Sequence, residues 1–234
     1  MSQLFFGGDG LALSKPEDVI PFLGKDPLHW KKGRSAFETA HSWFSAQGLP
    51  SAIRTVLDTN PLFADATLTG AYFERLTQLD ETGRGPSQTD VLAILKISSG
   101  VAVLGIEAKV DETFGPFVRD WSDGTPGKTL RLSRLIDELQ IDASSAGSLR
   151  YQLLHRTVAT VLEARQAKAR EAIMLVQSFS PSSIRAGFTH FQAFAVALRA
   201  PIAATGILSA PVQLNGVRLW IGWAECALSP TEVV

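Results

Sequence analysis

The sequence predicts a single α/β domain, residues 1–234, with a mixed central sheet flanked by helices. Apolar residues make up 45% of the chain and charged residues 19%, which is typical of a folded globular domain. Helical patterns alternate with short apolar runs that are typical of strands. A long helical pattern also separates a predicted hairpin from a later apolar run, an order that favours a mixed sheet with helices on its faces.

The N-terminal stretch, through about residue 28, contains several Gly and Pro and is predicted to be an irregular arm. From Ser35 onward, apolar residues recur at helical spacing. Ser35 followed by Glu38 three residues later fits a capping box at the start of this helix. Gly48 and Pro50 are predicted to end it, and a second, shorter helix follows.

Three strands are expected next. Residues 61–70 are predicted to form a loop and residues 71–79 the first strand. Residues 89–97 and 101–110 are two apolar runs around a Ser-Ser-Gly turn signal, which together predict a hairpin. Their nearly continuous apolar character favours strands that are covered on both faces of the sheet.

The second half of the chain alternates helices and strands. Residues 130–139 and 149–169 are predicted to be helices, the second with a clear apolar stripe. Residues 172–179 are predicted to be a buried strand, residues 188–198 a helix and residues 217–224 a last strand.

Charge and cysteine content exclude several classes of protein. The formal net charge is −1, so the chain lacks the global charge of a nucleic-acid binder, although binding needs only a local basic surface. Cys226 is the single cysteine, which excludes a disulfide framework or a Cys-based zinc site within one chain. No signal-peptide pattern or apolar run of membrane-spanning length is visible, so we expect a cytoplasmic protein without membrane association.

The predicted hairpin carries the residues that point to chemistry. Asp90 lies at the start of one strand, and Glu107 and Lys109 lie two residues apart near the end of the next. Residues two apart on a strand share a face. Because the start of one antiparallel strand lies beside the end of its partner, we expect all three side chains to converge.

This set suits a divalent cation, Mg²⁺ or Mn²⁺. Mg²⁺ prefers oxygen ligands and keeps several waters, so one or two carboxylates plus a substrate phosphate suffice. The backbone carbonyl of Ala108 is a natural extra ligand. The cation lowers the pKa of a bound water and offsets charge on the attacked phosphate. A nearby lysine can orient or deprotonate the water, or stabilise developing charge.

Asp90 together with Glu107–Lys109 resembles the PD-(D/E)xK motif of restriction-endonuclease-like nucleases. The predicted order of elements is similar to the αβββαβ core of that superfamily. Thr89 stands where the motif has proline, a position at which the superfamily varies. The chain from Leu28 to Phe179 also resembles an uncharacterised bacterial family with this fold.

The resemblance implies further site residues. The first helix of these nucleases often supplies another acid, and Glu38 is the matching residue, as an additional metal ligand. The helix after the motif often contributes polar side chains. Gln152, His155 and Arg156 have the spacing to share one helix face, and Gln152 is expected to position the substrate or the water.

Each residue also has a structural alternative. Glu107 and Lys109 can form a cross-strand ion pair on an exposed face, although Glu107 ends an apolar run where an unpaired carboxylate is costly. Asp90 can cap the preceding turn, and Glu38 can serve only the capping box. Glu74 is a second candidate acid because it can lie on the first strand.

We therefore expect a Mg²⁺-dependent phosphodiesterase that acts on nucleic acid. The resemblance implies nuclease chemistry as a class and, from what such folds commonly do, a role in genome defence or DNA repair. It does not distinguish DNA from RNA, although we expect DNA as the substrate. One alternative is a catalytically inactive binding or interaction protein that keeps the fold, and another is a hydrolase of small phosphate esters. The basic and aromatic residues from His29 to Arg34 are either phosphate contacts or a solvated turn. A homodimer is a further expectation, since two-fold dimers are the commonest assembly.

Overall fold

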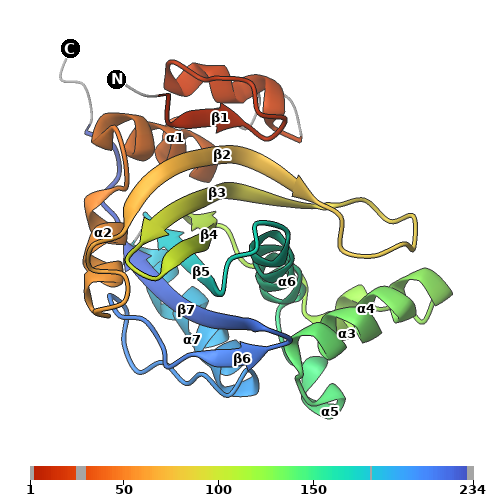
Figure 1. The fold of residues 1–234 in the computed structure, drawn as a ribbon. Coiled ribbons are helices and arrows are strands. Elements are labelled where there is room, and N and C mark those ends of the chain that lie inside the picture. Colours follow the sequence, from red (N-terminus) through yellow and green to blue (C-terminus); the bar gives the residue numbers. More distant parts are fainter. Residues whose placement is uncertain (1–2, 25–29, 180, 231–234) are drawn as a thin grey trace.

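The computed structural model of the protein describes residues 3–24, 30–179 and 181–230, with side chains described from residue 187 onward in the helix that begins at Pro181. One mixed sheet of seven strands runs through this part of the chain in the order β1-β2-β3-β4-β5-β7-β6 (Figure 1). The α/β class with a mixed central sheet flanked by helices is confirmed.

The centre of the sheet combines two kinds of strand pairing. Strands β2, β3 and β4 form an antiparallel meander, whereas β4, β5 and β7 lie parallel to one another. The strands are β1 (Phe5–Gly7), β2 (Thr67–Thr77), β3 (Ser87–Ile97), β4 (Gly100–Lys109), β5 (Glu171–Ser178), β6 (Val212–Leu214) and β7 (Val217–Glu225).

The helices of the described residues precede β2, or follow β4 and β5. Four of them, α1, α4, α6 and α7, are longer than ten residues. The helices are η1 (Pro16–Phe22, a 3-10 helix), α1 (Ser35–Ala46), α2 (Ser51–Asp58), α3 (Val118–Trp121), α4 (Pro126–Leu139), α5 (Ala143–Ala146), α6 (Tyr151–Gln166) and α7 (Pro181–Ala197).

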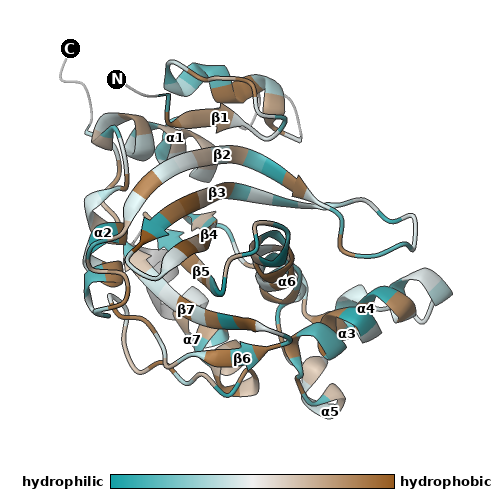
Figure 2. Cartoon of the chain, in the orientation of Figure 1, coloured by the Kyte–Doolittle hydropathy of each residue, from teal (hydrophilic) through white to brown (hydrophobic). Residues whose placement is uncertain are grey.

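The sheet separates two apolar clusters. Helices α4, α6 and α7 contribute to the cluster on one face, and α1 and α2 to the cluster on the other. Neighbouring residues of β4 enter different clusters, Val103 on the α6 face and Leu104 on the α1 face, because side chains alternate along a strand. Burial on both faces explains the continuous apolar runs, which Figure 2 shows in brown on the central strands.

The irregular N-terminal arm that we predicted through about residue 28 is wrong for much of its described part. Strand β1 pairs with β2 in parallel, Phe5 opposite Ala71, and η1 follows. Phe5 is buried and its ring centroid lies 4.6 Å from that of Phe44. Contacts with distant aromatic residues therefore order this segment, and the local Gly and Pro content gives no indication of these contacts. Residues 1–2 and 25–28 lie outside the described residues.

Two local predictions near α1 and β2 are also corrected. Ser35 is the first residue of α1 and Arg34 its N-cap, so Ser35 does not form the predicted capping box. Its hydroxyl instead donates to Glu112 Oε1 at 3.1 Å. The predicted loop at residues 61–70 contains the start of β2, because Thr67 pairs with Lys96 of β3. Both outcomes depend on partners far away in the sequence.

The other predicted elements are confirmed with shifted ends. The hairpin of β3 and β4 turns at the Ser-Ser-Gly signal, with Ile97 opposite Gly100. None of the helices in the described ranges has both the length and the apolar character needed to cross a lipid bilayer.

Candidate active site

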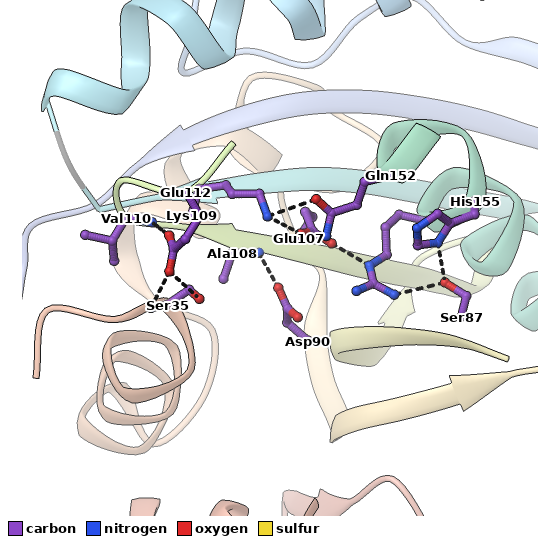
Figure 3. A network of polar contacts seen from close by, with 11 residues as sticks. Ser35, Ser87, Asp90, Glu107, Ala108, Lys109, Val110, Glu112, Gln152 and His155 are labelled. Atoms are coloured by element: carbon purple, nitrogen blue, oxygen red, sulfur yellow. Dashed lines mark hydrogen bonds and ion pairs between the residues drawn. The ribbon is translucent and has the colours of Figure 1, made fainter. Parts of the chain in front are cut away.

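Strands β3 and β4 separate at Asp90, the first of the three residues that the sequence predicts for the site. Their ladder runs from Ile97 opposite Gly100 to Val91 opposite Ile106. Asp90 is the next residue of β3, and its Oδ2 accepts a hydrogen bond from the Ala108 backbone N–H at 2.6 Å (Figure 3). The Asp90 carboxylate therefore lies in the fork between the two strands and bonds directly to the backbone beside Glu107.

Glu107 and Lys109 project from the same face of β4, as predicted. The Lys109 ammonium donates to Glu107 Oε1 at 2.6 Å and to Gln152 Oε1 at 3.1 Å. Arg156 of α6 donates to the other Glu107 oxygen, Oε2, at 2.5 Å. The side chain of Glu107 is only 1% exposed, so each oxygen of a buried carboxylate accepts from a cation.

A glycine brings α6 close to this face of β4. A Cβ at Gly105 would lie 2.0 Å from Thr160 Oγ1, so a larger residue there would push the helix away. Gln152, Arg156 and Thr160 are spaced by four and follow one side of α6. The close approach at Thr160 thereby places the two polar side chains above Glu107 and Lys109.

The polar network continues from Arg156 to the start of β3. Arg156 Nη1 donates to Ser87 Oγ at 3.0 Å, and Ser87 Oγ lies 2.9 Å from His155 Nδ1. Burial, with help from the Arg156 charge, lowers the pKa of His155 to about 3. The imidazole is therefore neutral at physiological pH. Sequence reasoning missed Ser87, which carries no local signal of this role.

The buried charges shift the pKa values of the two carboxylates in opposite directions. For Glu107, burial raises the pKa, but the charges and hydrogen bonds of Lys109 and Arg156 lower it by a larger amount, so that it falls to about 2. For Asp90, burial and the charge of Glu107 raise the pKa to about 7 despite the two cations. Lys109 and Arg156 compensate Glu107 well, whereas Asp90 has too little positive charge nearby.

Glu74 also belongs to this group, although its backbone breaks the regularity of β2. The β2–β3 ladder pairs Phe73 with Val91 and Arg75 with Thr89, so Glu74 lies across from Asp90. Its φ angle is +58°, a left-handed conformation that is uncommon for a non-glycine residue and is found at functional sites. Burial, together with the charge of Asp90, raises its pKa well above the usual value.

Glu38, predicted to be a further metal ligand, is used elsewhere. Its Oε1 accepts from the Gly33 backbone N–H at 2.8 Å and its Oε2 from the Ser229 backbone N–H at 2.7 Å. The buried carboxylate thus joins the start of α1 to the C-terminal segment. We correct the prediction: the acid that accompanies Asp90 and Glu107 comes from β2, not from α1.

Two of the basic and aromatic residues before α1 have contacts within the protein, Trp30 with rings of α1 and Lys32 with the C-terminal segment. The Trp30 ring centroid lies 5.4 Å from that of Phe37 and 6.1 Å from that of His41. Lys32 Nζ donates to the Pro230 carbonyl at 2.5 Å. His29 lies outside the described residues.

The oxygen atoms at the fork that could hold a cation are those of Asp90, Glu107 and the Ala108 carbonyl. The Lys109 carbonyl accepts from the Phe179 N–H at 2.8 Å, so the backbone groups of Lys109 face β5. Those of Ala108 consequently face the opposite side, where β3 has separated and Asp90 lies. Two carboxylates and one carbonyl suit Mg²⁺, which keeps several waters. Within the described ranges, no group of three or more His, Cys, Asp or Glu side chains is arranged to hold a metal ion.

The chain matches one known family. A family model described as a domain of unknown function (DUF6946) matches residues 12–227, a segment that includes the whole site. No curated protein and no solved structure matches the chain.

Proposed function

We propose that this chain, which belongs to the family of domains of unknown function described as DUF6946, is a metal-dependent nuclease of the PD-(D/E)xK type. It would hydrolyse phosphodiester bonds in nucleic acid. The observation that supports the proposal most strongly is the fork of β3 and β4. There Asp90 accepts a hydrogen bond from the backbone next to Glu107, and Lys109 contacts the Glu107 carboxylate. The order of the main elements, α1-β2-β3-β4-α6-β5, is also compatible with the core of that superfamily.

Asp90, Glu107 and the Ala108 carbonyl are the proposed ligands of Mg²⁺ or Mn²⁺. The accumulation of buried carboxyl groups supports this assignment. The charges of Asp90 and Glu107 raise the pKa of Glu74, and the charge of Glu107 raises that of Asp90 despite Arg156 and Lys109. A cation held there would stabilise the negative charge of the attacked phosphate and favour deprotonation of a water.

Lys109 is the proposed catalytic residue. Its ammonium is fixed between Glu107 Oε1 and Gln152 Oε1, at the end of β4 that faces the fork. A preorganised cation there can stabilise the charge that develops on the phosphate, and it does so without reorganisation during the reaction. Gln152 positions Lys109, and Arg156 keeps Glu107 ionised from its other side.

A role in genome defence or DNA repair comes from the resemblance, a homodimeric assembly from general frequencies, and a cytoplasmic location from the sequence pattern. DNA in preference to RNA is a further expectation, which the resemblance does not support. These expectations are secondary parts of the same proposal, and its main claim is the hydrolysis of nucleic acid.

A second candidate function is that of a binding protein that keeps the fold without catalysis. One observation favours it: both oxygens of Glu107 already accept from Lys109 and Arg156, as in a closed structural ion-pair network. A metal would have to compete with these contacts. The two functions therefore differ in whether a divalent cation binds at Asp90.

The decisive experiment measures thermal unfolding with and without Mn²⁺ on the wild type, Asp90→Ala and Asp65→Ala. Asp65 is an exposed carboxylate in the segment before β2 and serves as the matched control. Mn²⁺ at a hundredfold excess over its dissociation constant should stabilise the wild type and the control by about 2.7 kcal/mol. Asp90→Ala should lose the stabilisation.

Cleavage of DNA and RNA in Mg²⁺ or Mn²⁺ then tests Lys109. Lys109→Ala should keep the Mn²⁺-dependent stabilisation and lose cleavage by about a hundredfold or more, as when one preorganised donor is removed. A wild type that neither responds to Mn²⁺ nor cleaves any nucleic acid would refute the nuclease and favour the binding protein.

A further inference from the structure

A pocket of about 460 Å³ lies next to the active site, between the β2–β3 loop and the start of α6. Ser87 and His155 line it and also belong to the polar network that leads through Arg156 to Glu107. The other residues that matter here are Arg84, Trp121, Arg131 and Tyr151, and we call this hollow the stacking pocket.

Flat aromatic rings and cations meet in the stacking pocket. The rings of Trp121 and Tyr151 are stacked, with centroids 3.8 Å apart and planes 11° from parallel. The Arg84 guanidinium and the Lys128 ammonium each lie 5.5 Å from the Trp121 ring centroid. Tyr151 therefore covers one face of the Trp121 ring, and the two cations lie over the same ring, so a base that stacks on Trp121 takes the place of these cation–π contacts. Aromatic rings that accept bases, with cations nearby for the phosphates, are the chemistry with which proteins bind single-stranded nucleic acid.

A buried ion pair holds the wall of the stacking pocket in place. Arg131 of α4 pairs with Asp80 at the base of the β2–β3 loop, and both side chains are almost fully buried. The same guanidinium donates to the carbonyls of Arg84 and Gly85, at 3.2 and 3.3 Å. The loop that carries Arg84 is therefore fixed against α4, so the pocket exists before any ligand arrives.

Arg84 contacts the Trp121 ring, but its charge is not paired with a carboxylate among the described residues. Lys128 pairs with Asp123 at 2.8 Å and Arg131 with Asp80. Within the described ranges, no carboxylate forms an ion pair with Arg84. An arginine beside an aromatic platform suits a phosphate that is attached to a stacked base.

We propose that the stacking pocket binds one unpaired nucleotide of the substrate, its base on Trp121 and its phosphate at Arg84. The inference rests on the proposed nuclease function and narrows its substrate class. A base can lie on Trp121 only when it has left the duplex stack. The substrate is therefore nucleic acid with unpaired nucleotides, either a single strand or a strand end, and not an intact duplex.

The test measures binding of fluorescently labelled oligonucleotides in EDTA, by anisotropy, so that neither metal nor cleavage contributes. The probes are a single strand, the blunt duplex of the same sequence and a mononucleotide. We expect the wild type to bind the single strand at least tenfold more tightly than the duplex. Trp121→Ala should weaken single-strand binding about tenfold to a hundredfold, and Trp121→Phe should restore most of it.

Arg84→Ala should weaken single-strand binding and make it less dependent on salt, because one phosphate contact is lost. Arg170→Ala is the matched control, since Arg170 is exposed and precedes β5 at the end of that strand far from Lys109. Unfolding curves of all variants show whether each is folded. A mononucleotide that binds as tightly as the strand would assign the same pocket to free nucleotides.

Wild-type affinity in both Trp121→Ala and Arg84→Ala, or equal affinity for duplex and single strand, would overturn the inference. The Mn²⁺-dependent stabilisation of Trp121→Ala should equal that of the wild type, because Trp121 is no part of the proposed ligand set. A wild type that responds to Mn²⁺ but shows no preference for the single strand thus refutes the pocket alone. Single-strand binding that depends on Trp121, in a wild type that neither responds to Mn²⁺ nor cleaves nucleic acid, refutes the nuclease alone.

Discussion

Two buried clusters of charge lie on either side of Ser87, and they differ in balance. At the base of the β2–β3 loop, one carboxylate, Asp80, meets one guanidinium, Arg131. At the fork, Glu74, Asp90 and Glu107 share the cations of Lys109 and Arg156. The first cluster is neutral, whereas the second has more acid than base.

The pKa values follow this difference. Burial raises the pKa of Asp80, but hydrogen bonds from Arg131 and Thr82 more than offset this and lower it below the usual value. Burial raises the pKa of Asp90 to about 7, and Glu107 adds to the shift. A balanced pair stabilises the fold, while an unbalanced cluster costs stability that a divalent cation can restore. The comparison therefore separates structural ion pairs from the candidate metal site.

Arg131→Ala gives the largest expected effect. It leaves Asp80 buried without its partner, so the free energy of unfolding should fall by about 3–5 kcal/mol, measured by urea denaturation. Arg134→Ala, an exposed arginine on the same helix, should change it by less than about 0.5 kcal/mol. Equally small losses in both variants would show that the Asp80–Arg131 pair contributes little to stability. The distinction between this structural pair and the fork would then not hold.

Glu38→Gln tests whether Glu38 belongs to the structural class. The amide can accept at only one end, so either the Gly33 or the Ser229 N–H loses its partner. We expect a loss of about 1–3 kcal/mol in the free energy of unfolding, with the Mn²⁺-dependent stabilisation unchanged. A folded Glu38→Gln variant that lost the Mn²⁺-dependent stabilisation would instead support Glu38 as a metal ligand.

Asp90→Asn tests the unbalanced cluster through the pH dependence of stability, and its expected effect is the smallest for each pH unit. The folded protein holds the Asp90 proton up to about pH 7, whereas the unfolded chain releases it near its ordinary value of 3.8. Wild-type stability should therefore decrease relative to Asp90→Asn as pH rises between these values, by about 1.4 kcal/mol per unit.

The measurement compares urea unfolding of both proteins in EDTA at pH 5, 6 and 7, with Asp65→Asn as the control that keeps the wild-type slope. Asp80, whose pKa is lowered, contributes in the opposite sense: its stabilisation is present above the unfolded pKa and is lost as pH falls through the folded value. A wild type that gains stability over Asp90→Asn toward pH 7 would mean that Asp90 is well compensated.

Part of the site follows from short-range rules. Side chains alternate along strands, so the spacing of Glu107 and Lys109 alone predicts that they share a face. The turn at Ser98–Gly100 fixes the hairpin, and with it the position of Asp90 beside the end of β4. Gln152 and Arg156 share a helix face because they are four apart.

Other parts depend on contacts that no local pattern reveals. Glu38 is bound by the Ser229 backbone, 191 residues away, which its helical spacing cannot indicate. Glu74 lies across from Asp90 because of the β2–β3 register, and its left-handed backbone conformation is a feature that no local pattern indicates. The predicted irregular arm becomes β1 because Phe5 finds aromatic partners on α1 and β2.

The sequence by itself thus determined the α/β class, the central hairpin and the candidate trio of Asp90, Glu107 and Lys109, because strand and helix periodicities act over a few residues. Only the tertiary structure decided which acid accompanies them, how α6 approaches through Gly105, and that a pocket forms beside Ser87. These features require segments distant in the sequence to meet, and packing of the whole chain sets where they meet.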